Sequence, residues 1–105
     1  MVKMERDEII MLIEEYIGQF STGLSEKMKK KDKYFLLYSI SSCKDILEEI
    51  MNNPSVPCSY ILENKCNEYS RLACMNPHTT HAFSVAYDVA IYIYDIIQCS
   101  YTERR

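Results

Sequence analysis

The chain has 105 residues, of which 48% are apolar and 26% are charged, and this is the composition of one small globular domain. Only two residues are glycine, which is too few for the tight turns of a sheet protein or for a phosphate-binding loop. The formal net charge of −3 gives no general affinity for nucleic acid or for an anionic membrane.

The first half of the chain predicts two helices. The first covers about residues 4–20, where apolar side chains recur at helical spacing and so share one face. These side chains are Ile9, Ile13, Tyr16 and Phe20. The second covers about residues 25–51 and ends before Pro54, because proline disfavours helical geometry in the residue before it. Its apolar face consists of Leu36, Ile40, Cys43, Leu47 and Ile50.

The second half predicts two more helices, each beginning at a proline, which suits the first helical turn. The third covers about residues 57–74, with Cys58, Leu62, Cys66, Tyr69 and Ala73 on its inner face. The fourth covers about residues 77–100, with Ala82, Ala86, Val89, Ile93 and either Ile96 or Ile97 inside. Because the breaks between helices are short, neighbouring helices should form antiparallel hairpins. We therefore expect an all-α fold, a compact bundle of about four helices forming a single domain over residues 1–105.

Five cysteines are an odd number for a disulfide framework. The strongly charged start, Met1 to Asp7, does not resemble a secretory segment, and no run approaches the roughly 20 apolar residues of a membrane span. We therefore expect a cytoplasmic protein with reduced thiols. Cys43, Cys58 and Cys66 fall on inner faces, where a thiol behaves as a small apolar side chain, whereas Cys74 and Cys99 should be more accessible.

Metal binding and catalysis both lack a supporting pattern. Cys66, Cys74, His78 and His81 are possible zinc ligands by type, but their spacing matches no paired-cysteine site, and Cys66 and Cys74 lie on different faces. Cys74 and His81 could pair as nucleophile and base, yet nothing in the sequence orients the histidine. No nucleophile elbow or phosphate loop is present. The sequence predicts no metal, no cofactor and no enzymatic activity.

Near the start of the second predicted helix, five lysines precede two tyrosines. The lysine cluster is Lys27, Lys29, Lys30, Lys31 and Lys33, and the tyrosines are Tyr34 and Tyr38. Both tyrosines should face outward, because they fall opposite the apolar face of the helix. Basic side chains beside exposed rings suit single-stranded nucleic acid, through phosphate neutralisation and base stacking. The other interpretation is a solvated helix start with tyrosines resting on a neighbouring helix, since Glu26 and Asp32 dilute the charge.

The last predicted helix is apolar or aromatic over most of its circumference. Phe83, Tyr87, Tyr94 and Tyr101 recur along a line about 100° from the Ala82 face, with Ile91 further round. We call Phe83, Tyr87, Ile91, Tyr94 and Tyr101 the aromatic stripe. A central helix buried on several sides would explain this stripe. A surface kept for another chain would explain it too, because tyrosine is favoured where one end of the side chain is buried and the other wet.

Taken together, these patterns predict a small non-enzymatic protein-interaction module that self-associates through the aromatic stripe, with a twofold dimer as the simplest assembly. The alternative is a nucleic-acid-binding or host-nuclease-inhibiting accessory protein that uses the lysine cluster. In overall composition the chain resembles small, cysteine-tolerant, lysine- and tyrosine-rich helical proteins encoded by mobile elements of low-GC bacteria. Some such proteins inhibit host defence nucleases, and the resemblance implies a similar setting for this alternative.

Overall fold

Four α-helices account for about four-fifths of the chain in the computed structural model, which describes residues 4–102 and the side chains of residues 4–98. The helices are α1 (Arg6–Gly23), α2 (Lys30–Asn52), α3 (Cys58–Met75) and α4 (Thr80–Thr102). No strand occurs within residues 4–102. The predicted all-α fold with four helices is therefore confirmed.

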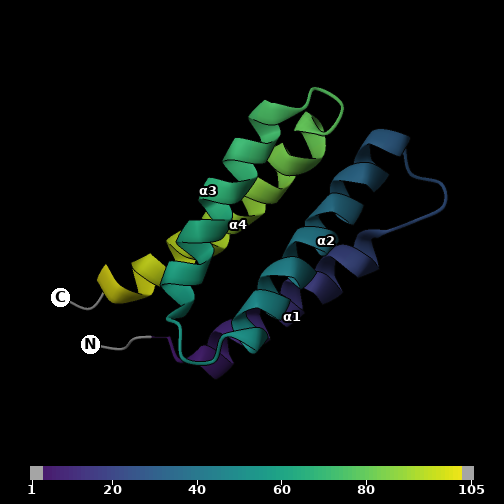
Figure 1. Ribbon diagram of the computed structural model, residues 1–105. Helices are drawn as coiled ribbons and strands as arrows, with labels where there is room; N and C mark the ends of the chain where they lie inside the picture. The colour runs from purple at the N-terminus through teal and green to yellow at the C-terminus, as the bar shows by residue number, and fades with distance from the viewer. Residues whose placement is uncertain (1–3, 103–105) are drawn as a thin grey trace.

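The helices form two antiparallel hairpins, α1 with α2 and α3 with α4, which lie against each other in Figure 1. The hairpins join chiefly where α2 packs along α4, and both of these helices run in the same direction. A smaller contact links α2 to α3, so α2 has all three other helices as neighbours. The core of the molecule therefore gathers around α2 as well as around α4.

In the first hairpin, one boundary of each helix differs from the predicted one. α1 continues through Gly18 to Gly23, and neither glycine takes a positive φ. α2 begins at Lys30 rather than at residue 25, and Ser25 instead starts a turn in which its carbonyl accepts from the Met28 amide.

α4 begins at Thr80, three residues after the predicted start at residue 77. Asn76 organises a turn before it, because its side-chain oxygen accepts from the His78 amide at 2.9 Å and its carbonyl accepts from the Thr79 amide. Asparagine commonly forms such turns with the backbone two residues on. Pro77 therefore lies in this turn and not in the helix.

α2 buries a second stripe beside the predicted apolar face. Ser39 and Ser42 are buried along with Ile46, toward α4. The Ser39 hydroxyl donates to the Phe35 carbonyl at 2.8 Å, and the Ser42 hydroxyl donates to the Ala86 carbonyl of α4 at 3.3 Å. Because these hydroxyls keep hydrogen-bond partners, burying them carries little penalty.

Arg6 ties the start of α1 to the far end of α2. Its guanidinium donates to the carbonyls of Ile50 at 2.7 Å, Asn53 at 3.3 Å and Val56. The last carbonyls of a helix have no partner within the helix, so a cation placed there satisfies them. This contact positions the connection between α2 and α3 against α1.

Candidate docking surface

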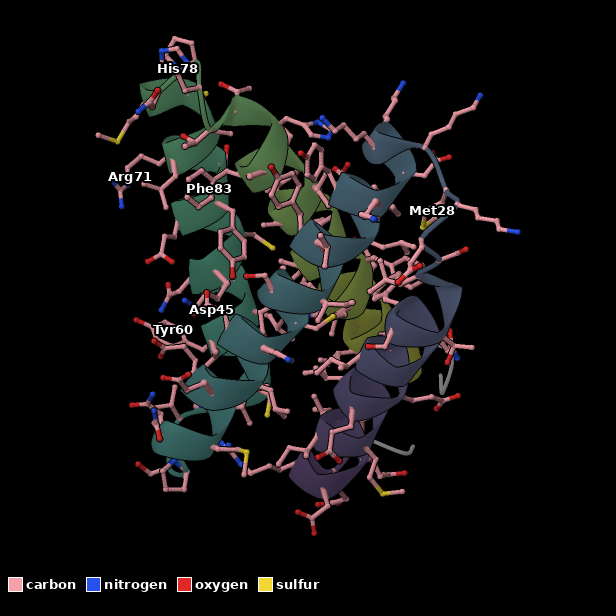
Figure 2. All side chains as sticks on the ribbon, turned by 90° about the vertical axis from the view of Figure 1, so that its right-hand side faces the viewer. Met28, Asp45, Tyr60, Arg71, His78 and Phe83 are labelled. Atoms are coloured by element: carbon pink, nitrogen blue, oxygen red, sulfur yellow. The ribbon has the colours of Figure 1, made fainter. Side chains whose placement is uncertain are left out.

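Most of the aromatic stripe packs against the protein's own core. Phe83, Tyr87, Ile91 and Tyr94 are half-buried there, and the side chain of Tyr101 lies outside the described residues. The Phe83 ring stacks on Tyr69 of α3, with centroids 6.3 Å apart and planes 26° apart, and Figure 2 shows Phe83 on the side facing α3. The stripe is therefore partly covered by α3 within one chain.

Among the described side chains of α4, the large exposed aromatic one is Tyr92, which is not part of the predicted aromatic stripe. Its side chain is 57% exposed and lies beside Tyr16 of α1, with ring centroids 5.8 Å apart. Phe20 follows one turn along α1, its ring 6.4 Å from that of Tyr16. Phe35, at the start of α2, is 45% exposed. Aromatic side chains from three helices thus meet at one place on the surface.

These side chains line an open hollow of about 390 Å³, which we call the aromatic groove. Its lining residues are Tyr16, Gln19 and Phe20 of α1, Phe35 of α2, and Asp88, Val89 and Tyr92 of α4. Val89 forms a buried floor, while Gln19 and Asp88 are exposed at the rim. Periodicity within a single helix could not reveal this groove, because the three helices meet there only after folding.

The ionisation of Tyr16 follows from its place in the groove. Burial raises the pKa of its hydroxyl to about 12, and the neighbouring Tyr92 hydroxyl and Glu15 carboxylate add to the shift. The Tyr16 hydroxyl therefore stays protonated throughout the neutral range. It offers a hydrogen-bonding group at the edge of an otherwise apolar wall.

A second hollow continues along α1. It has a volume of about 590 Å³ and is lined by Met4, Glu8, Met11, Leu12, Glu14 and Glu15. Met11 is 67% exposed. Glu15 and Leu12 lie within one turn of Tyr16 and Gln19 on the helix, so the two hollows adjoin.

The lysine cluster lies at the α1–α2 connection and on the first turn of α2. Lys27, Lys29, Lys30 and Lys31 are exposed, and Lys33 is half-buried. Tyr34 is exposed and stacks on the half-buried Tyr38, with centroids 6.1 Å apart. His81 of α4 meets Tyr38 edge-on at 5.7 Å. The structure thus adds a histidine to the predicted lysine–tyrosine surface, from a segment far away in the sequence.

A polar network that the sequence did not predict joins α2 to α3. The Lys65 ammonium lies 2.8 Å from Asp45 Oδ2 and 3.2 Å from Glu68 Oε1, and the Tyr69 hydroxyl donates to the same Asp45 oxygen at 2.5 Å. Burial pushes the pKa of Asp45 up, but the hydrogen bonds from Lys65 and Tyr69 outweigh it and lower the pKa. Figure 2 shows Asp45 between the two helices. Because the polar groups of Asp45, Lys65 and Tyr69 bond to one another, we interpret the network as a structural bridge between α2 and α3.

Cys43, Cys58 and Cys66 are buried as predicted, Cys74 is exposed, and the Cys99 side chain lies outside the described residues. Burial raises the pKa of the Cys43 thiol to about 11, so this thiol stays protonated and unreactive.

Within the described part of the chain, no group of three or more His, Cys, Asp or Glu side chains could hold a metal ion. None of the described helices has the length and hydropathy needed to cross a membrane.

Comparisons of the chain with protein-family models, with curated proteins and with solved structures found no match.

Proposed function

We propose that the protein is a non-enzymatic interaction module that docks another protein chain on the aromatic groove. The observation that carries this proposal is the meeting of four aromatic rings from three helices at one open hollow, with Phe35 and Tyr92 about half exposed. One wall of the groove belongs to α4, and the sequence predicted an interaction surface on this helix. The contact residue there is Tyr92, one residue beyond Ile91 of the stripe.

The lining of the groove favours binding over catalysis. It consists of four aromatic rings, one valine, one amide and one carboxylate, and none of the lining residues is a histidine, cysteine, serine or threonine. The common nucleophile–base pairs combine serine, cysteine or threonine with histidine, and the groove offers none of these side chains. An apolar surface with a polar rim is instead the usual anatomy of a protein interface.

The exposed area of Phe35 and Tyr92 indicates how large a partner must be to bind stably. Since an aromatic side chain offers about 150–250 Å², covering Phe35 and Tyr92 would remove about 200 Å² from water and contribute about 5 kcal/mol. Association costs about 4–15 kcal/mol, so these two rings alone do not secure a complex. The partner must also cover Tyr16, Phe20 and the adjoining Leu12, and this favours a protein segment over a small ligand.

Site-specific photocrosslinking tests the proposal. A photoreactive phenylalanine analogue at position 92 should yield covalent adducts with a protein in an extract of the native host. The matched control is the same analogue at Tyr60 of α3, which is 56% exposed and lies away from the groove. Adducts at position 92 and none at position 60 are expected. Equal adduct formation at both positions, or none at position 92, would overturn the proposal.

A second candidate, binding of single-stranded nucleic acid, has one specific observation in its favour. Tyr34, Tyr38 and His81 form a row of contacting rings beside the lysine cluster. Bases stack on such rings while lysines neutralise phosphates. Fluorescence anisotropy with a labelled single strand tests it. Lys30→Glu with Lys31→Glu should abolish the binding and its salt dependence, whereas Tyr92→Lys should leave both unchanged.

A further inference from the structure

The walls that α1 and α4 contribute to the aromatic groove carry acidic side chains, whereas Phe35 on the α2 wall follows exposed Lys31 by one helical turn. Between Asp7 and Glu26 the sequence contains no lysine or arginine, and between residues 72 and 102 it again contains none. Arg6, the remaining basic residue of α1, directs its guanidinium to carbonyls at the end of α2. The walls that α1 and α4 contribute to the groove therefore offer no cation to a partner.

Acidic side chains flank both long sides of the groove. On α1, Glu8 and Glu15 are two helical turns apart, and the Glu15 charge acts on Tyr16 within the groove. On α4, Asp88 lines the groove and Asp95 follows two turns later on the same side, exposed. Two carboxylate rows thus run beside a strip of apolar surface.

From this arrangement, and resting on the proposed function, we infer that the partner is an amphipathic helix whose apolar face is flanked by lysine or arginine. An apolar groove between helices accepts such a face through side chains spaced three and four residues apart. Like charges placed together at an interface weaken it strongly, whereas opposite charges steer association and fix the register. A cationic flank meets Glu15 and Asp88 where an acidic flank would be repelled.

The adjoining hollow supports a partner segment of helical length. From Phe20 through Tyr16 to Leu12 the apolar surface follows one side of α1 for eight residues, which is about 12 Å or just over two turns. A helix lying along α1 would place one apolar residue in the aromatic groove and another beside Leu12.

The inference is tested with two labelled peptides of about 18 residues, each long enough to span both hollows as a helix. One carries leucine on one face and lysine on the other, and the second replaces every lysine by glutamate. The leucine–lysine peptide should bind in fluorescence anisotropy, with affinity that falls as salt is added, and the leucine–glutamate peptide should not bind. Equal binding of the two peptides would overturn the inference.

Variants of the protein locate the binding. Tyr92→Ser and Asp88→Lys should each lower the affinity of the protein for the leucine–lysine peptide by about tenfold. The matched controls on α3, Tyr60→Ser and Glu63→Lys, should change its affinity by less than about twofold, and circular dichroism verifies that each variant is folded. Equal losses in the controls would show general charge attraction and would also overturn the inference. Adducts at position 92 without preference for the cationic peptide would leave the proposed function standing and reject this partner.

Discussion

Asp45 accepts two side-chain hydrogen bonds at one carboxylate oxygen, from Lys65 and Tyr69 of α3. The lowered pKa of Asp45 means that its charged form is favoured by folding. A carboxyl group with a folded-state pKa below its unfolded value of about 3.9 stabilises the fold above that pH. The stabilisation is then lost as the pH falls through the folded-state pKa.

Asp45→Asn should therefore lower the free energy of unfolding by about 1 kcal/mol at pH 7, a figure kept small because the Asp45 side chain is 46% exposed and partly screened. The difference from the native protein should shrink as the pH falls below about 4. Urea denaturation at pH 7 and at pH 3 measures both values. Glu63→Gln, on the exposed side of α3, is the control. A difference that stayed constant with pH would contradict the assigned role of the Asp45 charge.

Tyr16 gives the opposite dependence on pH. Its pKa is raised to about 12 by burial, so between about pH 10 and 12 the folded chain keeps a proton that the unfolded chain has lost. The contribution of Tyr16 to stability is present below about pH 10 and is lost as the pH rises through about 12. Tyr16→Phe removes this titration. Its stability relative to the native protein should therefore be higher at pH 11 than at pH 7, as denaturant titrations at both values will test.

At the scale of the helix, Gly18 lies inside α1 with open space around the position of a Cβ atom. Glycine within a helix costs about 0.5–1 kcal/mol relative to alanine, because it loses more conformational freedom on folding. Gly18→Ala should raise the free energy of unfolding by that amount. Gly23→Ala is the comparison, since its added Cβ would lie 3.4 Å from a Leu36 methyl carbon at the end of the helix. Thermal unfolding in which Gly18→Ala melts below the native protein would contradict this account.

Arg6 connects helices that are distant in the sequence. Arg6→Ala should destabilise the fold by about 2 kcal/mol, because it leaves carbonyls at the end of α2 and in the following connection without their charged donor. Arg71→Ala provides a matched control, since Arg71 is exposed on α3 and its side-chain contact is with the Met75 sulfur. Equal melting temperatures for the two variants would contradict the role assigned to Arg6.

The helices themselves were predictable because each carries an apolar face at helical spacing, such as Ile9 and Ile13 or Ile40 and Cys43, and such faces are local properties of sequence. The buried serines Ser39 and Ser42 were not predictable from hydropathy, because their burial depends on carbonyl acceptors one turn back or on α4. The aromatic groove depends in the same way on contacts between helices. Tyr16 and Phe20 pack against the core as predicted, and the parts of their rings that stay exposed form one wall of the groove.

At the scale of the whole molecule, charge is distributed unevenly. The lysine cluster occupies the α1–α2 connection, and the face formed by α1 and α4 is acidic. The two candidate surfaces adjoin at the start of α2, where Phe35 of the groove follows Tyr34, but Tyr92 and Lys30 lie on separate helices. This separation lets Tyr92→Lys and Lys30→Glu discriminate between protein docking and nucleic-acid binding in one pair of measurements.

The same charge distribution decides how self-association depends on salt. In a twofold dimer formed through the aromatic groove, identical surfaces meet, so Glu15 and Asp88 of one copy would face those of the other. The Debye length is about 30 Å at 0.01 M salt and about 3 Å at 1 M, so this repulsion acts at low salt and is screened at high salt. We predict a monomer at low salt and a dimer population that grows with salt, measured by sedimentation equilibrium. Tyr92→Lys should abolish the dimer and Tyr60→Lys should preserve it. Association strongest at low salt would contradict this and would indicate that the lysine cluster of one copy meets the acidic face of the next.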